Sequence, residues 1–302
     1  MSAIHERIAG RRVVASISGG KDSAAMSLYL KELGIEHDRV FMDTGWEHAK
    51  TYDYLRGELA RVIGPVTEIR GDRTMVELVK HKGMFPGRLR RFCTQELKVF
   101  PMQRHLASLN TETINAVGIR AAESANRAAM PEWEWSEGFD CEVWRPLIAW
   151  SEQDVIAIHK RHGLAPNPLY LMGATRVGCW PCIYARKAEI KLIADTDPER
   201  IVTIRAMEAE VGDAMQARAD AKGTTLATRP AWFASRLGRV GVDPIDKVVE
   251  WSRTSHGGRQ FEMYAADPAD AGCMRWGMCE TSPPEIEAAA TALPTGAPGA
   301  TK

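Results

Sequence analysis

Stretches typical of buried strands alternate with stretches of helical spacing through the first half of this chain. The apolar, β-rich stretches lie at residues 12–18, 39–43, 66–70, 113–120 and 142–148. The helical stretches between them lie at residues 23–33, 49–63, 74–82 and 94–109. A helix between two strands carries the chain back to the same end of a sheet, so that the strands pair in parallel. The alternation therefore predicts an α/β fold built on a doubly wound parallel sheet.

The pattern changes after residue 184. Helical stretches then follow one another without an intervening strand, at residues 185–195, 198–222, 229–237 and 244–252. The end of the chain, 281–302, is rich in Pro, Ala, Gly and Thr, a composition typical of disorder. We therefore expect an α/β domain at 1–184, a mainly helical region at 185–280 and a disordered tail at 281–302.

Charge and hydropathy limit the classes of partner. The 302 residues carry 39 basic and 39 acidic side chains, so any contact with nucleic acid must be local. No apolar run approaches the roughly 20 residues that span a bilayer, and residues 1–12 lack the apolar core of a signal peptide. We expect a cytoplasmic protein without a membrane partner, whose thiols stay reduced. Its six cysteines are then candidate metal ligands or reactive thiols.

Residues 18–23 read SGGKDS where the first strand passes into the first helix. Gly19 and Gly20 allow main-chain N–H groups to turn inward, because no Cβ is in the way. These donors add to the positive N-terminal end of the helix, and Lys21 adds a full charge. Hydroxyl donors come from Ser16, Ser18 and Ser23. The spacing differs from that of the Walker P-loop, so the stretch is either a simple turn or another kind of phosphate site.

Two further segments would reach the same edge of the sheet, where ligands bind in doubly wound folds. Gly118 and Arg120 end one strand, and we expect the Arg120 guanidinium to contact a phosphate. Asp43 ends another, and its carboxylate could bind ribose hydroxyls or Mg²⁺ or could cap the following turn.

SGGKDS after a strand resembles the PP-loop of the ATP pyrophosphatase (adenine nucleotide α-hydrolase-like) superfamily. Five other segments resemble, in the same order, the phosphoadenosine phosphosulfate (PAPS) reductase family. They are FMDTGWEHAKTYDYL (41–55), RRFCTQELKVFPM (90–102), GIRAAES (118–124), WRPLIAWSEQDV (144–155) and NPLYLMGATRVGCWPC (167–182). The resemblance covers about residues 12–185 and identifies the chain as a member of this family.

The resemblance implies an adenine nucleotide site and a PP-loop, Rossmann-like fold. ATP with Mg²⁺ would be split into AMP and pyrophosphate, which adenylates a substrate. The residues expected to hold the nucleotide are Ser16, Ser18, Gly19, Gly20, Lys21, Asp22, Ser23, Asp43, Gly118 and Arg120. Of these, we assign catalytic roles to Lys21, Asp43 and Arg120.

The chain also departs from the sulfonucleotide reductases of the family. Those enzymes have a degenerate loop and end in Glu-Cys-Gly-Leu-His, for which the nearest match here is GMCE at 277–280. The intact loop is more similar to the sulfur-transfer relatives, among them DNA phosphorothioation and tRNA thiolation proteins. We therefore expect ATP-dependent sulfur transfer to an acceptor that the sequence does not name, nucleic acid being one candidate, with a protein donor of sulfur or electrons. The alternatives are a sulfonucleotide reductase that releases sulfite and a non-catalytic nucleotide- and cluster-binding subunit of a larger complex.

Cys179 and Cys182 form a C-x-x-C motif whose two thiolates can reach one metal ion from a single turn. Cys273 and Cys279 form a second pair, and the two pairs could bind structural zinc. Buried, inert thiols are the other possibility, since free cysteine packs as a small hydrophobe. Cys141 has no partner nearby in sequence and is interpreted as structural.

The resemblance favours iron over zinc. In the iron–sulfur members, the segment that corresponds to Cys93 and the C-x-x-C motif together ligate a [4Fe–4S] cluster. Phe92 replaces the adjacent cysteine of those members. We therefore assign the cluster to Cys93, Cys179, Cys182 and Cys273, with the helical region closing the site. Three arrangements stay open: Cys279 in place of Cys273, three ligands with one open iron, and zinc with Cys93 as a redox thiol.

The most basic local run comprises Lys80, Lys82, Arg88, Arg90 and Arg91. Such a run could receive a phosphorylated substrate or a nucleic-acid backbone, or could simply be solvated. Lys98 follows Cys93 by five residues on a predicted helix. Its ammonium group could neutralise the cluster or the sulfur of a substrate, or could lie on a solvated face.

Overall fold

The computed structural model describes residues 3–226, 229–233 and 243–255, and a six-stranded sheet forms its centre. The strands are β1 (Arg12–Ile17), β2 (His37–Asp43), β3 (Thr67–Arg70), β4 (Thr113–Val117), β5 (Trp133–Ser136) and β6 (Cys141–Trp144). Their order is β3-β2-β1-β4-β6-β5, and every neighbouring pair is parallel except β5 with β6. The chain runs outward from β1 to β3 and then returns to β4 on the other side of β1. The predicted doubly wound α/β fold is confirmed.

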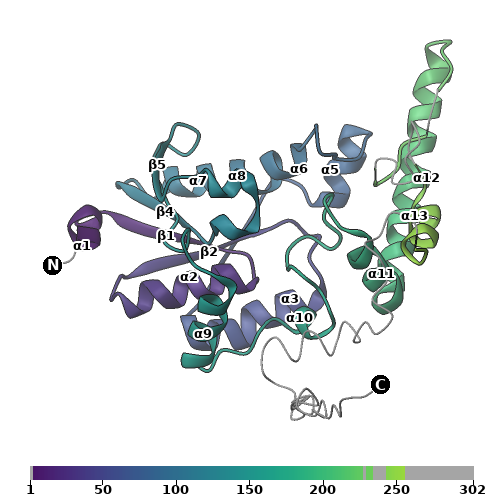
Figure 1. The fold of residues 1–302 in the computed structure, drawn as a ribbon. Coiled ribbons are helices and arrows are strands. Elements are labelled where there is room, and N and C mark those ends of the chain that lie inside the picture. Colours follow the sequence, from purple (N-terminus) through teal and green to yellow (C-terminus); the bar gives the residue numbers. More distant parts are fainter. Residues whose placement is uncertain (1–2, 227–228, 234–242, 256–302) are drawn as a thin grey trace, which may run out of the picture.

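Helices cover both faces of this sheet (Figure 1). One face carries α2 (Lys21–Glu32), α3 (Ala49–Tyr54), the π-helical η1 (Leu55–Leu59), α4 (Ala60–Ile63) and α9 (Glu152–Arg161). The other side carries α5 (Met75–Lys82), α6 (Phe92–Thr94), the π-helical η2 (Gln95–Val99) and α7 (Phe100–Ser108). The helices expected at 49–63 and 94–109 are therefore present, each with a π-helical turn inside it.

The strands bury both of their faces because alternate side chains point to opposite sides of a sheet. Val13 and Ile17 of β1 pack into the core beneath α2. Val14, between them, packs with Met102 of α7 in a core on the opposite face. Burial on both faces explains why these strands read as continuous apolar runs in the sequence.

One segment that we expected to be a loop contains the antiparallel edge strand. Residues 121–140 form η3 (Ala121–Glu123), α8 (Ala125–Ala128) and β5. β5 is a strand because it pairs with β6, and the rings of Trp133 and Trp144 stack at 4.8 Å. The expected strands at 113–120 and 142–148 are also shorter, since β4 ends at Val117 and β6 at Trp144.

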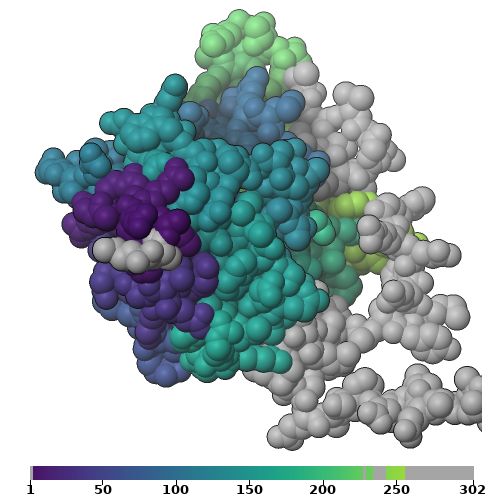
Figure 2. Space-filling view, turned by 60° about the vertical axis from the view of Figure 1, so that its left-hand side comes forward, coloured from purple at the N-terminus to yellow at the C-terminus, as the bar shows by residue number. Residues whose placement is uncertain are grey.

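The N-terminal helix α1 (Ala3–Ile8) lies on the surface beside the sheet, as Figure 2 shows in purple. Arg7 and Arg11 both bond the carboxylate of Glu142 on β6, at 2.5 and 2.7 Å. These two ion pairs tie the start of the chain to β6 of the sheet.

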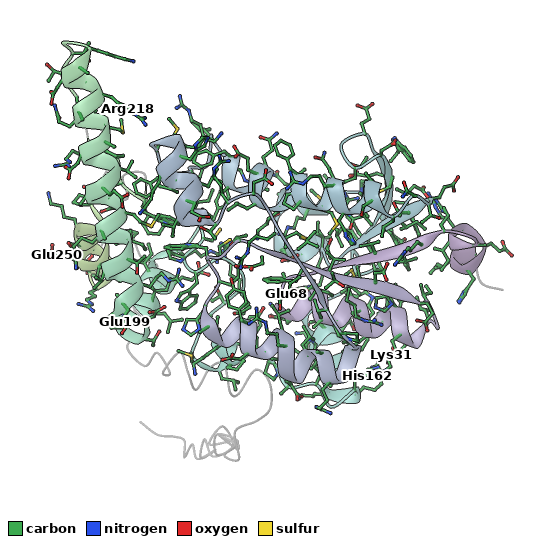
Figure 3. The ribbon with its side chains drawn as sticks, turned by 180° about the vertical axis from the view of Figure 1, so that it is seen from behind. Lys31, Glu68, His162, Glu199, Arg218 and Glu250 are labelled. Carbon is green, nitrogen blue, oxygen red and sulfur yellow. The ribbon has the colours of Figure 1, made fainter. Side chains whose placement is uncertain are left out.

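The C-terminal part is helical, as expected. Its described residues form α11 (Lys187–Thr196), α12 (Pro198–Ala221) and α13 (Ile245–Ser252). The short α10 (Pro168–Leu171) precedes them, within the range expected for the α/β domain. The long helix α12 runs past the α/β domain from Glu199 toward Arg218 (Figure 3). Its Ile204 packs into a core with Trp46 and Leu97 from the α/β domain.

The helix expected at 229–237 is not present at residues 229–233. The buried carboxylate of Glu208 on α12 instead accepts hydrogen bonds from the main-chain N–H groups of Trp232 and Ile245, at 2.9 and 2.8 Å. These bonds hold Trp232 against α12 and give the first N–H of α13 an acceptor. Residues 234–237 and the expected tail at 281–302 lie outside the described residues.

Candidate functional site

The SGGKDS stretch forms a tight loop between β1 and α2, and its own serines hold its shape. Gly19 has a φ of +73°, and a Cβ there would lie 2.9 Å from the Thr51 side chain. The Ser18 main-chain N–H donates to the Ser23 hydroxyl at 3.1 Å, and the Gly20 N–H donates to the Ser18 hydroxyl at 3.3 Å. Gly19 is thus required by both backbone conformation and space. Helix α2 begins at Lys21, two residues before the expected start, so the loop amides lie at its N-terminal end.

Two cations and two carboxylates meet at this loop. Lys21 is only 8% exposed, and its Nζ lies 3.6 Å from Asp22 and 3.5 Å from Glu152. Arg120, 5% exposed, donates from Nε to the other oxygen of Asp22 at 2.5 Å. A Cβ at Gly118 would lie 2.8 Å from the Asp22 carbonyl oxygen, so the end of β4 can approach α2 only as glycine. The structure therefore brings together Lys21, Asp22, Gly118 and Arg120, as the sequence predicted.

Three residues that sequence reasoning did not assign also contact the loop. The Lys21 N–H donates to the Tyr170 hydroxyl at 3.1 Å. The Asn167 side-chain amide donates to the Gly19 carbonyl at 3.1 Å, and His159 Nε2 lies 2.9 Å from the Lys21 carbonyl. Burial lowers the pKa of His159, so the ring is neutral and Nε2 can donate. Asn167 and Tyr170 belong to the NPLY stretch, and their place within the resemblance was the signal that could have found them.

Ser16 and Asp43 occupy different surroundings from the loop. The Ser16 hydroxyl donates to the Asn115 side chain on β4 at 3.1 Å. The Asp43 carboxylate accepts from the Gly45 N–H at 2.8 Å, from Tyr52 at 2.7 Å and from Arg70 at 2.9 Å. Burial opposes its ionisation, but the hydrogen bonds from Tyr52 and Arg70 outweigh burial and hold the pKa of Asp43 below its ordinary value. Asp43 therefore caps the turn after β2, the alternative that its position in the sequence allowed.

Three of the predicted thiols share a second site. Cys93, Cys179 and Cys182 line one cavity of about 150 Å³, together with Lys98 of η2. The loop after β2 lies against Cys179, because Glu47 and Cys179 form an isolated β-bridge. Cys141 lies apart, buried in the core beneath α7, which agrees with the structural role expected for it.

A buried acid adjoins the thiols. Glu47 is 4% exposed and accepts hydrogen bonds from the Thr44 hydroxyl at 2.8 Å and from Tyr52 at 3.0 Å. The Cys179 sulfur lies 3.9 Å from Glu47. No feature of the sequence had indicated Glu47, since its role depends on a bridge between two distant loops.

The protonation of this cluster follows from burial and charge. Burial raises the pKa of the Cys179 thiol to about 11, although Lys98 opposes the shift. Burial also raises the pKa of Cys93. The pKa of Lys98 is raised chiefly by Cys179, and also by Glu47, against the effect of burial. Cys93 and Cys179 therefore favour the protonated thiol in the protein alone, and a metal ion would have to displace those protons to bind.

The donor set is chemically suited to a thiolate-bound centre, but it is incomplete. Within residues 3–226, 229–233 and 243–255, no group of three or more His, Cys, Asp or Glu side chains is arranged to hold a metal ion. Cys273, the predicted fourth ligand, and Cys279 lie outside the described residues. The three thiols thus share one cavity without forming a closed ligand set.

Comparison with known proteins places these features in context. The family model of the phosphoadenosine phosphosulfate reductase domain matches residues 12–185. An uncharacterised 37.8 kDa protein of Escherichia phage 186 is 32% identical, over 88% of this chain and 96% of the relative. The adenosine 5'-phosphosulfate reductase of Allochromatium vinosum is 35% identical, over 32% of this chain and 36% of that enzyme. The corresponding reductase of Rhodococcus opacus is 30% identical, over 48% of this chain and 58% of that enzyme.

Among solved structures, the phosphate complex of the PAPS reductase from Candida auris has a TM-score of 0.47 and 21% identity. The match covers 58% of this chain and 84% of the yeast chain. Within the described residues, no helix is both long and apolar enough to cross a membrane.

Proposed function

This chain belongs to the phosphoadenosine phosphosulfate reductase domain family, and from that premise we propose that it splits ATP into AMP and pyrophosphate to activate an acceptor for sulfur transfer. The observation that carries the proposal is the pair of buried cations, Lys21 and Arg120, at the N-terminal end of α2. Both now face Asp22. A triphosphate bound beside Lys21 and Arg120 would meet two fixed positive charges and the main-chain N–H groups at the start of α2.

The chemistry of this proposal is electrostatic. Cleavage between the α and β phosphates builds negative charge on the departing pyrophosphate. Lys21 and Arg120 would stabilise that charge, and their burial would make each interaction stronger than it is in water. Mg²⁺ would be expected on the phosphates themselves. The acceptor oxygen attacks the α phosphate and becomes an AMP ester, which is a good leaving group for a sulfur nucleophile.

We propose that the second site handles sulfur. Cys93, Cys179 and Cys182, with Cys273 as the fourth ligand, would hold a [4Fe–4S] cluster, and three ligands or zinc remain the alternatives. When bound, such a cluster would supply iron for holding sulfide or for electron transfer. Lys98 would offset the negative charge of the thiolates, because it lines the same cavity.

Product analysis tests the proposal. The purified chain is incubated with ATP and Mg²⁺, with and without a candidate acceptor, and the products are separated. We expect AMP and pyrophosphate, and we expect Lys21→Ala to abolish them. Lys31→Ala is the matched control, because Lys31 lies on the same helix and its Nζ donates to the Val62 carbonyl at 3.2 Å, away from the loop. Formation of ADP and phosphate would rule the mechanism out.

A sulfonucleotide reductase is the second candidate, and the relatives named adenosine 5'-phosphosulfate reductases favour it. That activity predicts sulfite from a sulfonucleotide in the presence of a thiol reductant, without any ATP. Sulfite release by the wild-type chain would decide for the reductase.

A further inference from the structure

An exposed arginine turn stands at the mouth of the thiol cavity. Gly87 and Arg90 exchange two main-chain hydrogen bonds, at 3.2 and 3.1 Å, so that residues 87–90 form a closed turn. The segment before the turn is anchored, since Pro86 is buried and the Phe85 ring lies 5.7 Å from that of Trp232. The turn therefore has a fixed base and an exposed tip.

The positive charge of the basic run is concentrated at the tip of this turn, because carboxylates neutralise the lysines that precede it. Lys80 and Lys82 pair with Glu210 at 2.7 Å and Glu96 at 2.6 Å. Arg88, Arg90 and Arg91 are exposed, and among the described residues no carboxylate lies within ion-pair distance of them. The basic run of the sequence thus separates into a neutralised helix and an arginine turn with three available cations.

The arginine turn, residues 87–91, is continuous with the thiol cavity. Tyr184 lines the cavity, and the guanidinium groups of Arg88 and Arg91 lie 5.7 and 5.3 Å from its ring centroid. Arg91 lines the cavity as well, two positions before Cys93. A molecule held by the turn would therefore lie directly at the entrance to the thiols.

Leu89, at the tip between Arg88 and Arg90, is 99% exposed. A leucine between two guanidinium groups can contact a nucleobase while they bind the phosphates on either side. Arg88, Leu89 and Arg90 are exposed and do not line the cavity, so the tip suits an extended polyanion better than a small anion, which requires a concave pocket. A base can reach Leu89, Tyr184 or the cavity only when it is unpaired.

We propose that the arginine turn is the docking surface for the acceptor, and that the acceptor is a single-stranded or looped nucleic acid. This inference rests on the proposed sulfur-transfer function, for which it names the substrate class. Arg88 and Arg90 bind backbone phosphates, Leu89 contacts a base, and Arg91 with Tyr184 directs one nucleotide toward Cys93, Cys179 and Cys182.

Fluorescence anisotropy with the full chain tests the docking surface without ATP. The probes are labelled single-stranded RNA and DNA of mixed sequence, about 20 nucleotides long, with shorter probes and a duplex for comparison. The test variant is Arg88→Ala/Arg90→Ala. The matched control is Arg56→Ala/Arg61→Ala, which removes two exposed arginines that pair with Glu68 and Glu58 elsewhere. Thermal unfolding confirms that both variants fold.

We expect the wild-type chain to bind single strands of either sugar better than duplex, with affinity that rises with length. Arg88→Ala/Arg90→Ala should weaken binding about tenfold and lower the slope of log K against log salt by about 1.4, because two phosphate contacts are lost. Leu89→Ala should weaken binding and leave that slope unchanged. The control should bind as the wild type does.

Three outcomes would overturn the proposal: equal loss in both arginine variants, affinity independent of probe length with competition by pyrophosphate, or preference for duplex. Because the assay contains no ATP, its failure differs from a failure of the proposed reaction. A chain that binds oligonucleotides but makes no AMP would refute only the ATP chemistry.

Discussion

The hydroxyl of Tyr170 accepts a hydrogen bond from the main-chain N–H of Lys21 at 3.1 Å. Tyr170 is buried and lies 149 positions after Lys21 in the chain. The Lys21 N–H is one of the donors that a phosphate on the loop would use. The tyrosine therefore occupies, in the protein alone, a donor that the proposed nucleotide would need.

Tyr170→Phe should lower the stability of the protein alone and increase the response to ATP. The variant leaves the Lys21 N–H buried without its tyrosine acceptor, which costs about 1 kcal/mol of unfolding free energy. Bound phosphate restores an acceptor, so the rise in melting temperature on adding ATP should exceed that of the wild type. Tyr54→Phe is the control, because its hydroxyl donates to the Ala165 carbonyl away from the loop. Equal ATP responses in both variants would contradict this role of Tyr170.

Breaking the Arg120–Asp22 pair should be costly. Both groups are largely buried, so Arg120→Ala removes the closer of the two cations beside the Asp22 carboxylate and leaves only Lys21, at 3.6 Å. The loss of this charge-assisted hydrogen bond should lower the unfolding free energy by about 2 kcal/mol. Adding Asp22→Asn removes the charge, and the double variant should recover part of the loss. Denaturant unfolding of the four proteins measures this coupling. Strictly additive losses would show that the two side chains do not interact.

Stability should fall as the pH is lowered through the range just below 6.5, and His159 should be one cause. Burial lowers its pKa from 6.5, beside the charges of Asp22 and Lys21. The unfolded chain therefore binds a proton at a higher pH than the folded chain, and the stability held above pH 6.5 is lost toward the lowered pKa. His159→Gln keeps a donor for the Lys21 carbonyl but cannot titrate. Its unfolding free energy should depend less steeply on pH in this window, and an unchanged slope would count against the assignment.

The cysteine assignments predict which thiols retain iron. After anaerobic reconstitution with iron and sulfide, the wild type should carry iron and acid-labile sulfide, and Cys93→Ser, Cys179→Ser and Cys182→Ser should each lose most of both. Cys141→Ser should keep them, because Cys141 is buried in the core beneath α7. Metal analysis and visible absorbance give the readout. Zinc without iron in the wild type would favour the zinc alternative.

The sequence by itself determined the fold class and the position of the loop. Strand and helix periods are patterns among neighbouring residues, so the sequence shows them directly. The glycine that a φ of +73° requires at position 19 can also be identified from the sequence. The grouping of Cys93 with the C-x-x-C motif also followed, because a resemblance in segment order carries long-range information. The described residues agree with each of these predictions.

Only the tertiary structure decided which distant groups complete the sites. Tyr170 reaches Lys21 and Glu47 reaches Cys179 through contacts between segments more than a hundred positions apart. The edge strand β5 likewise depends on its pairing with β6, and the position of Trp232 depends on its hydrogen bond to Glu208. Local composition does not predict such contacts, because each depends on how the fold brings separate segments of the chain together.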